Sequence, residues 1–466
     1  FDRDGDNIDG EAFAGRCGND RHHFRFIVSP EDASEMEDLR AFTRELMDDM
    51  ARDLDSQLDW VAVDHWNTDN PHIHILVRGH TDNGNDLVID RDYIREGMRG
   101  RAEERVTAEL GHRTEREIER ALQREVTAER WTGLDRRLQR LQDEMGLVDL
   151  RPDPSGHSLS SRTHLLGRMA SLERLGLAEA HGPASWSLAN DLETTLRDLG
   201  ERGDIIKTMH RAMTRGHGIA DTGRFALHDD VPDNPVIGRL VERGLHDEIT
   251  GDAYAIVDGV DGRVHHLKFS DLEMTGDTDR GAIVELRSWE DERGKRRQSL
   301  AVRSDLALGD QISASGATWL DRQLVAPEPL VTGSGFGAEV EQAKRDRAEH
   351  LAEEGLARRQ GTRIVLARNL LATLRDHELS EAVSTIAGRT GLDHVPGEDG
   401  DRIKGVFRER IKLASGRFAM IENAHGFELV PWRPSLDRHL GEPVSGIIKS
   451  GGGIEWSLGR SRGIAI

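Results

Sequence analysis

The ten residues from His65 to His74 constrain the fold of this chain more than any other segment. They read His-Trp-Asn-Thr-Asp-Asn-Pro-His-Ile-His, so residues typical of a tight turn separate two histidine-bearing ends. The stretch before them, residues 59–65, and the stretch after them, residues 72–77, both have the pattern of short strands. We therefore predict a β-hairpin with histidines at its mouth.

The flanking sequence predicts the rest of an α+β domain. Residues 23–29 alternate apolar and polar side chains, which is typical of a half-buried strand. Residues 31–58 place apolar side chains at three- and four-residue spacing, which predicts a long amphipathic helix. A short strand at 87–90 precedes an Arg- and Glu-rich helical stretch that reaches residue 145. We expect an antiparallel sheet with flanking helices.

The histidines of the hairpin predict a metal site. His72 and His74 are two residues apart on a strand, so their side chains leave the same face. His65 lies across the turn, and three imidazoles can converge on one divalent ion while leaving coordination positions open, as in catalytic sites. The neighbouring groups that could orient the ring N–H groups are Asp64, Asn67 and Asp69.

The pattern His-x-Asn-x-Asp-Asn-Pro-His-x-His resembles the third motif of plasmid mobilisation relaxases. These relaxases belong to the HUH endonuclease superfamily, which is named after a His–hydrophobe–His pair. The resemblance is to the branch that includes the border endonuclease of Ti plasmids. Residues 93–130 and 431–434, with the remaining chain, resemble long relaxases that carry a C-terminal region of unknown function.

The resemblance implies a metal-dependent nuclease that nicks single-stranded DNA at a transfer origin during conjugative mobilisation. A tyrosine hydroxyl attacks the scissile phosphate and forms a phosphotyrosyl link, while a divalent metal, Mg²⁺ or Mn²⁺, offsets the developing charge. The partners that it implies are single-stranded DNA, relaxosome accessory proteins and a coupling protein. We expect no membrane insertion and a cytoplasmic location.

The sequence leaves the nucleophile open. Only two tyrosines occur, Tyr93 and Tyr254. Related relaxases carry the nucleophile in a segment reading roughly Tyr-x-x-Arg-x-Gly, and placing Arg3 and Gly5 on that pattern puts the tyrosine directly before Phe1. We therefore expect the main nucleophile upstream of Phe1. Tyr93, which opens a helix after the hairpin, is the alternative within the chain, and Tyr254 reads as a strand residue.

An internal repeat organises the C-terminal part. Residues 172–198 and 351–376 share a helix ending in Gly-Leu-Ala, a loop with Gly, a strand ending in Leu-Ala and a helix ending in Leu-Arg-Asp. This order is typical of a winged-helix-like unit. The sequence thus predicts a catalytic domain, a winged-helix-like module, a small β-barrel, a helical repeat of the winged-helix type and a C-terminal small β-barrel, at residues 1–150, 157–228, 232–300, 301–398 and 400–466.

Composition excludes some classes of protein and leaves others open. No apolar run is long enough to span a membrane, and the single cysteine excludes a disulfide scaffold. The net charge of −22 argues against a general nucleic-acid coat. Two other functions remain possible from the residues: a non-catalytic DNA-binding module, and a three-histidine metallohydrolase that acts through bound water.

Overall fold

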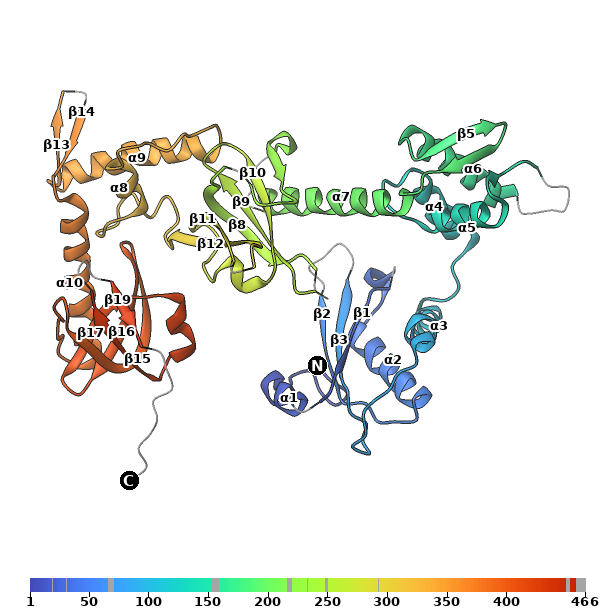
Figure 1. The fold of residues 1–466 in the computed structure, drawn as a ribbon, viewed down its shortest axis with the longest axis horizontal. Helices are drawn as coiled ribbons and strands as arrows, with labels where there is room; N and C mark the ends of the chain where they lie inside the picture. The colour runs from blue at the N-terminus through green and yellow to red at the C-terminus, as the bar shows by residue number, and fades with distance from the viewer. Residues whose placement is uncertain are drawn as a thin grey trace. The chain divides into compact units, whose positions relative to one another are not determined.

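The computed structural model describes residues 1–18, 20–30, 32–65, 71–152, 159–215, 220–232, 234–247, 250–291, 293–361, 363–449 and 453–457, without the side chains of 34 and 159–161. The chain forms two compact units, Phe1–Gly200 and Glu201–Ile466, and each is described by itself (Figure 1). Both mix helices with sheets whose strand pairs are mainly antiparallel, so the predicted α+β class is confirmed. Within the described residues, no helix has the length and apolar character needed to cross a membrane.

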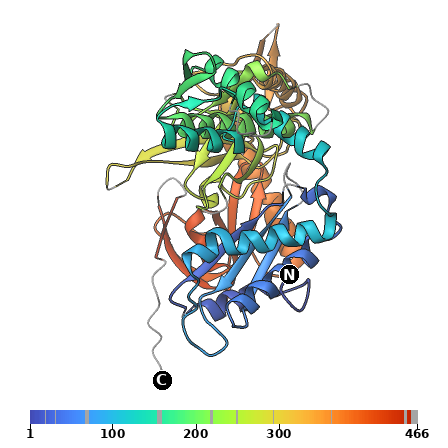
Figure 2. The same ribbon diagram turned by 90° about the vertical axis from the view of Figure 1, so that its right-hand side faces the viewer.

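The first unit opens with a three-stranded antiparallel sheet in the order β1-β3-β2, where β3 is central. Helices α2 and α3 lie along one face of this sheet (Figure 2). The elements of this part are α1 (Gly10–Cys17), β1 (His23–Val28), α2 (Leu39–Asp53), β2 (Trp60–His65), β3 (His72–Arg78), a π-helical turn η2 (Tyr93–Gly97) and α3 (Met98–Leu110).

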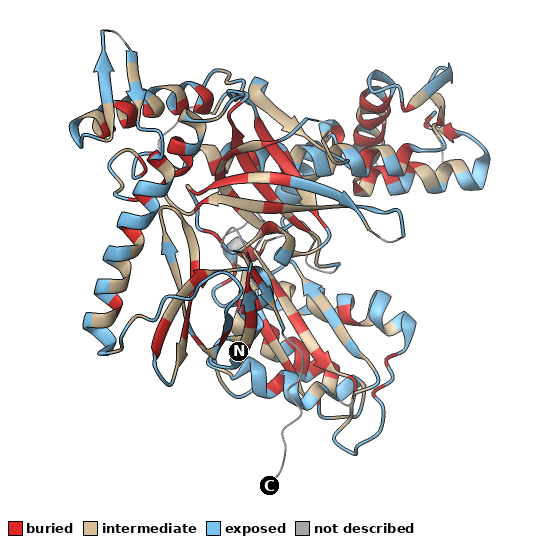
Figure 3. Ribbon diagram, turned by 60° about the vertical axis from the view of Figure 1, so that its left-hand side comes forward, coloured by how far each residue is buried: buried red, intermediate tan, exposed pale blue. Residues whose placement is uncertain are grey.

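A hydrophobic core forms between α2 and the sheet because both elements have one apolar face. On β3 the side chains of Ile73, Ile75 and Val77 are buried and alternate with half-exposed ones (Figure 3). Leu46 and Met47 of α2 are equally buried and contribute to the same core. The opposite face of the sheet therefore carries the remaining side chains of β3.

The rest of the first unit is a helical module with a small sheet in the order β4-β6-β5. Two of its helices start at a capping box, at Thr114 with Glu117 and at Thr132 with Asp135. Its elements are α4 (Glu115–Thr127), α5 (Gly133–Met145), β4 (Val148–Asp149), α6 (Leu159–Arg174), β5 (Ala178–Gly182), β6 (Ser185–Leu188) and the start of α7 (Leu192–Thr214).

The expected border between residues 150 and 157 does not separate two cores. Val126 and Leu138, before it, share one hydrophobic cluster with Met169 and Leu196, after it. The Arg- and Glu-rich stretch that reads as a solvated helix is split into three helices, two of which contribute to this cluster. The equal numbers of arginines and acidic residues suggested a fully solvated helix, but α5 buries Leu134 and Leu138.

The second unit begins with a six-stranded sheet in the order β12-β11-β8-β9-β10-β7. Strand β7, which the sequence assigns to the preceding module, pairs in parallel with β10, and the later half of α7 packs on the same sheet through Ile205 and Met209. The strands are β7 (Phe225–Leu227), β8 (Ile237–Leu245), β9 (Ala253–Gly259), β10 (Val264–Phe269), β11 (Ile283–Glu290) and β12 (Arg296–Ser304).

A second helical module and a five-stranded sheet, β17-β16-β15-β18-β19, complete the second unit. A barrel would require the two end strands of a sheet to pair with each other. Among the described residues, β12 and β7 do not pair, and neither do β17 and β19, so the two small barrels stay a prediction. The elements are α8 (Trp319–Leu324), α9 (Phe336–Glu353), β13 (Ala357–Gln360), β14 (Arg363–Leu366), α10 (Leu370–Thr390), β15 (Arg402–Leu413), β16 (Gly416–Asn423), β17 (Gly426–Pro431), β18 (Pro443–Ile448) and β19 (Ile454–Trp456).

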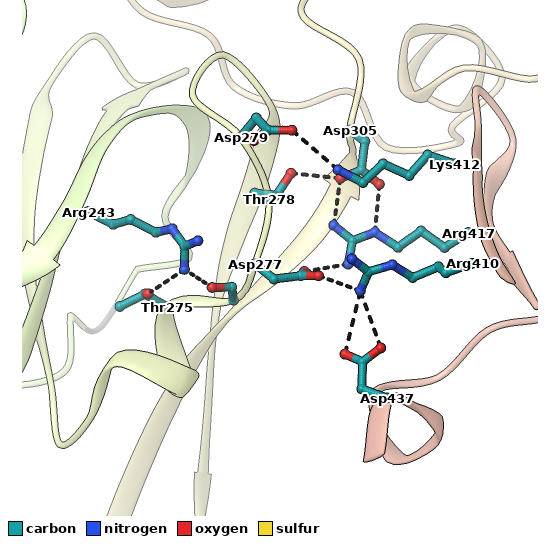
Figure 4. A network of polar contacts seen from close by, with 11 residues as sticks. Arg243, Thr275, Asp277, Thr278, Asp279, Asp305, Arg410, Lys412, Arg417 and Asp437 are labelled. Atoms are coloured by element: carbon teal, nitrogen blue, oxygen red, sulfur yellow. Dashed lines mark hydrogen bonds and ion pairs between the residues drawn. The ribbon is translucent and has the colours of Figure 1, made fainter. Parts of the chain in front are cut away.

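Charged side chains join the two larger sheets of the second unit (Figure 4). Arg417 of β16 donates to Asp305 at 2.6 and 2.5 Å and to Asp277 at 2.6 Å. Burial favours the neutral form of Asp305, but the hydrogen bonds from Arg417 and Thr278 outweigh it, so the pKa of this carboxyl is lowered. The joint between the two sheets is thus built on ion pairs.

The internal repeat predicted from the sequence is visible in the element bounds. Hairpin β5–β6 starts at Ala178 and hairpin β13–β14 at Ala357, and helices α7 and α10 start at Leu192 and Leu370. These offsets of about 179 and about 178 residues agree with the alignment of the two segments. We call residues 125–199 the first repeat and residues 311–375 the second repeat. Their assignment to the winged-helix class stays a prediction.

Candidate metal centre

The backbone of β2 and β3 brings the three predicted histidines together. His65, the last residue of β2, stands directly opposite His72, the first residue of β3, in the antiparallel register. His74 follows two residues later and leaves the same face of the sheet. The ring centroids lie 5.2 Å apart for His65 and His72, 4.8 Å for His65 and His74, and 5.0 Å for His72 and His74.

The nitrogen atoms of this cluster lie close to the spacing of metal ligands. One ring nitrogen from each histidine can be chosen so that all three lie within 4.8 Å of one another. Metal–nitrogen bonds of about 2.1 Å hold two ligands at most about 4.2 Å apart, so a small ring movement suffices. All three residues are half-buried on the sheet face that α2 does not cover, which leaves room for further ligands.

Asp64 lies on the other face of the sheet, where it contacts α2. Adjacent residues on a strand point to opposite faces, so Asp64 is turned toward α2 while His65 faces outward. Its carboxylate accepts a hydrogen bond of 2.9 Å from Nε of Arg40, which is in the first turn of α2. Asp64 thus ties the helix to the strand, whereas Asn67 and Asp69 lie outside the described residues.

Two protein families match this chain. A model described as MobA/VirD2-like relaxase nuclease domain matches residues 9–104, which contain the histidine cluster. A model described as protein of unknown function DUF3363 matches residues 165–296 and 287–465. The chain belongs to the DUF3363 family and carries a relaxase nuclease domain. No curated protein and no solved structure matches.

The family matches confirm the predicted resemblance to long relaxases. The nuclease domain and the DUF3363 region occupy the parts of the chain expected from the motif and from the C-terminal sequence. The resemblance is therefore carried by two independent segments. The family description of the C-terminal region states no function, so what that region does has to be argued from its own structure.

The structure places Tyr93 at the far end of α2 from the histidines of the relaxase domain. Its hydroxyl donates a hydrogen bond of 2.9 Å to Asp53, the last residue of α2, whereas Arg40, near the start, reaches Asp64 beside the histidines. About 13 residues of helix separate these two points, or about 20 Å. Burial and the nearby Asp53 also raise the pKa of Tyr93. This position favours a nucleophile other than Tyr93.

The second tyrosine is also held in a hydrogen bond to a carboxylate. Tyr254, on β9, donates a hydrogen bond of 2.8 Å to Glu242 on the neighbouring strand β8. Burial, with the adjacent carboxylate, raises its pKa. A tyrosine in this state is a poor nucleophile, because attack requires the phenolate or a base that accepts its proton. The interpretation of Tyr254 as a strand residue is confirmed.

The outer face of the relaxase sheet carries residues that the sequence argument did not single out. Ile27 stands opposite His74 in the register and Val63 lies beside His65, and their exposed fractions are 39% and 55%. Arg25 extends the same face. The period-two pattern of residues 23–29, read together with the hairpin, could have identified these positions, because it assigns every second side chain to the histidine face.

A groove borders β1, an edge strand of this sheet. It is lined by the end of β1, by η2 and α3, and by α4, and its volume is about 1430 Å³. Four arginines and four acidic residues are among those that line it: Arg95, Arg99, Arg120, Arg124, Asp32, Glu35, Glu103 and Glu117. Pockets for small ligands are usually about 300–1,000 Å³, so this groove is large enough for a longer ligand.

Proposed function

We propose that this chain is the nicking enzyme of conjugative mobilisation, which cuts one DNA strand at a plasmid transfer origin through a phosphotyrosyl intermediate. The observation that carries the proposal is the convergence of His65, His72 and His74 on the open face of a sheet that lies within the matched relaxase nuclease domain. In the reaction a tyrosine oxygen forms a bond to the scissile phosphorus, the bond to the 3′ oxygen breaks, and that oxygen leaves as a hydroxyl.

The three imidazoles suit a divalent cation, for which we propose Mg²⁺ or Mn²⁺. Such an ion would polarise the phosphoryl oxygens and offset the charge that develops in the transition state. The residues of the chain contribute its fixed placement, because two adjacent strands hold all three rings. Relaxase nuclease domains generally use a divalent metal, and the closeness of the three rings supports this proposal.

We propose that the single strand lies across the outer face of the sheet and into the adjoining groove. Ile27 and Val63 offer apolar contacts for bases on either side of the histidine cluster. Arg95 and Arg120 in the groove wall offer guanidinium groups that suit phosphates. Local arginines of this kind reconcile single-strand binding with a net charge of −22.

The attacking hydroxyl, in this proposal, belongs to a tyrosine upstream of Phe1. Phe1 and Ala62 exchange two backbone hydrogen bonds, of 2.9 and 2.8 Å, which is the pattern of an antiparallel pair. A strand that continues this pairing in the upstream direction runs alongside β2 toward His65. Such a course would bring upstream residues to the metal ligands.

We further propose, from the resemblance, a cytoplasmic complex with relaxosome accessory proteins and a coupling protein. These partners would deliver the nicked strand for transfer. The exposed charged surfaces of the helices α3 and α4 are available for such contacts within the first unit.

The test compares metal binding and strand cleavage in three proteins: the wild-type chain, His72→Ala and the control His23→Ala. His23 lies on β1 of the same sheet, at the end distant from the cluster. Calorimetric titration with MnCl₂ should show at least about tenfold weaker binding for His72→Ala, since one of three ligands is lost, and no change for His23→Ala. An unchanged Mn²⁺ affinity in His72→Ala would remove the metal site from the proposal.

Cleavage is assayed with the full reading frame, including any residues that precede Phe1. Labelled single strands that tile the DNA beside the gene are incubated with MgCl₂, and covalent adducts are separated under denaturing conditions. The expected result is an adduct whose protein side maps to a tyrosine upstream of Phe1. Cleavage without an adduct would instead support the three-histidine metallohydrolase, and binding without cleavage would support the non-catalytic DNA-binding module.

A further inference from the structure

The hairpin β13–β14 of the second repeat presents an unusual concentration of arginine. Residues 357–368 contain four arginines and no acidic residue, in a chain that has 85 acidic and 63 basic residues. All four arginines are exposed. A basic segment in a chain with this acidic excess is a local departure from the overall charge.

The register of the hairpin sorts these side chains onto two faces. Gln360 stands opposite Arg363 and Arg358 stands opposite Val365, so these four side chains share one face. Each of the four is exposed. The other face carries Arg359, whose guanidinium is paired with Glu349 of α9. The first face therefore points outward, and we call Arg358, Gln360, Arg363 and Val365 the outward face of the hairpin.

The arginines of the outward face lack ion-pair partners within the part of the chain that the structure describes. Neither Arg358 nor Arg363 forms an ion pair there, and the same is true of Arg368, which follows the hairpin immediately. Most other arginines of the second unit are paired with carboxylates, as Arg417 is with Asp305. Three guanidinium groups are thus available to a ligand that carries several negative charges.

The first repeat provides an internal comparison, because the same scaffold there lacks these arginines. Its hairpin β5–β6 has the same helix before it and the same helix after it. The matched pairs, first repeat and second repeat, are Glu179 and Arg358, Ala180 and Arg359, Ser185 and Arg363, and Asn190 and Arg368. Folding of the hairpin therefore does not require arginine at these positions.

We propose that the outward face of hairpin β13–β14, together with Arg368, binds the phosphate backbone of duplex DNA. Arginine binds phosphate through a planar fork of N–H donors, and a two-stranded ribbon has the dimensions of a DNA groove. A narrow minor groove also attracts arginine side chains. This contact would be independent of base sequence, since phosphates carry no sequence information.

The residues of the hairpin favour a duplex over a single strand. Proteins that bind single strands stack bases on aromatic side chains, and residues 357–368 contain no aromatic residue. The corresponding part of the first repeat does contain one, Trp186. A duplex with its continuous double row of phosphates is the ligand that an arginine ribbon without stacking groups can recognise. This binding is separate from the nicking activity proposed above and uses none of its residues.

The experiment measures the affinity of the full chain for a fluorescent 24-base-pair duplex of arbitrary sequence by anisotropy, over a range of NaCl concentrations. The test variant carries Arg358→Ala, Arg363→Ala and Arg368→Ala. We expect at least about tenfold weaker binding near 0.1 M NaCl and a salt dependence that is less steep by about 2 to 3 in the log–log slope, because each lost phosphate contact removes about 0.9. The control carries Glu179→Ala, Ser185→Ala and Asn190→Ala and should bind like the wild type.

A charge-preserving variant separates binding from folding. With lysine in place of the same three arginines, the positive charge remains, so the salt slope should stay within about 0.5 of the wild-type value. A lysine variant as weak as the alanine variant would overturn the proposal. Equal duplex binding by the alanine variant and the wild type would do the same, as would a loss that is larger for a 24-nucleotide single strand than for the duplex. The variant His72→Ala should bind the duplex normally.

Discussion

Arg347 and Asp321 are both fully buried and face each other in a paired arrangement: Nε and Nη2 of the guanidinium donate to the two carboxylate oxygens at 2.9 Å each. The remaining N–H groups donate to the carbonyl oxygens of Ile312, Ala314 and Gly316. The same constellation exists in the first repeat, where Arg168 meets Asp135. The pairs link α9 to the start of α8 in the second repeat and α6 to the start of α5 in the first repeat.

Removing the arginine of one pair should strongly destabilise its unit. We expect Arg347→Ala to lower the free energy of unfolding of the second unit by about 3–5 kcal/mol, because Asp321 would be left as a buried charge without its partner. Arg168→Ala should act similarly on the first unit. Urea unfolding followed by hydrogen exchange in each unit measures both effects. Arg345→Ala, an exposed site on the same helix as Arg347, is the control and should change stability by less than about 0.5 kcal/mol.

Tyr93→Phe should leave the formation of the DNA adduct unchanged within about threefold. The tyrosine hydroxyl is bonded to Asp53 at the end of α2 that is distant from the histidines, so its loss removes one hydrogen bond and about 1 kcal/mol of stability. Asp53 keeps its ion pair with Arg101. Adduct assays and thermal unfolding provide the measurements. Complete loss of the adduct in Tyr93→Phe, with a normal fold, would restore Tyr93 as nucleophile.

Asp64→Asn tests the role of the carboxylate beside the histidines. Because Asp64 binds Arg40 on the helix side of the sheet, we expect the Mn²⁺ affinity to stay within about threefold of the wild-type value. Stability should fall by about 1–3 kcal/mol, as for hydrogen bonds to charged groups. A loss of affinity of about 10- to 100-fold is typical of residues that orient metal-binding imidazoles, and such a loss would contradict our assignment.

The second unit should lose stability when the pH falls from 6.5 toward 4. His266 is buried on β10, and burial lowers the pKa of its imidazole to about 4 from an ordinary value of 6.5. Between these values the unfolded state binds a proton that the folded state does not, so the free energy of unfolding rises with pH in this window. The loss amounts to about 3 kcal/mol at most, and the neighbouring His246 and Lys268 act in the same direction.

The measurement is thermal unfolding at pH 7 and pH 5. His266→Phe keeps a neutral ring that can stack on Tyr254, so this variant should show a smaller difference between the two pH values than the wild type. His425→Phe, at an exposed turn, serves as the matched control and should keep the wild-type difference. Equal pH sensitivity in His266→Phe and the wild type would exclude His266 as the cause.

The strand pattern carried most of the information about the candidate site. Period-two alternation around His72 and His74 predicted both the hairpin and the common face of the rings, and the structure confirms this geometry. The same rule places the side chain of Asp64 on the other face of the sheet from His65, so alternation and proximity in sequence give different expectations for Asp64. The position of Tyr93 could not be predicted, since it depends on how α3 packs against α2.

The alignment of the two repeats missed one segment that both of them share. The segment Thr-x-Leu-Asp-Arg-x-Leu occurs at 132–138 and again at 318–324, and it contains the aspartates of the two buried pairs. The distance along the chain from this segment to the paired arginine differs between the repeats, so an alignment with a constant offset does not detect it. Without this match, α5 was not assigned to the first repeat, and a domain border was expected near residue 150. In the structure α5 and the hairpin β5–β6 share one core.

The buried arginine–aspartate pairs take all their hydrogen-bond partners from outside the hairpins. The exposed positions of one hairpin can therefore carry new residues while the other hairpin retains the old ones, since these positions take no part in the buried pairs. The exposed side chains of the two hairpins are in this sense interchangeable. Placing arginine at Glu179, Ser185 and Asn190 of the first scaffold would transfer a surface property without changing the core that Leu188 shares with α5.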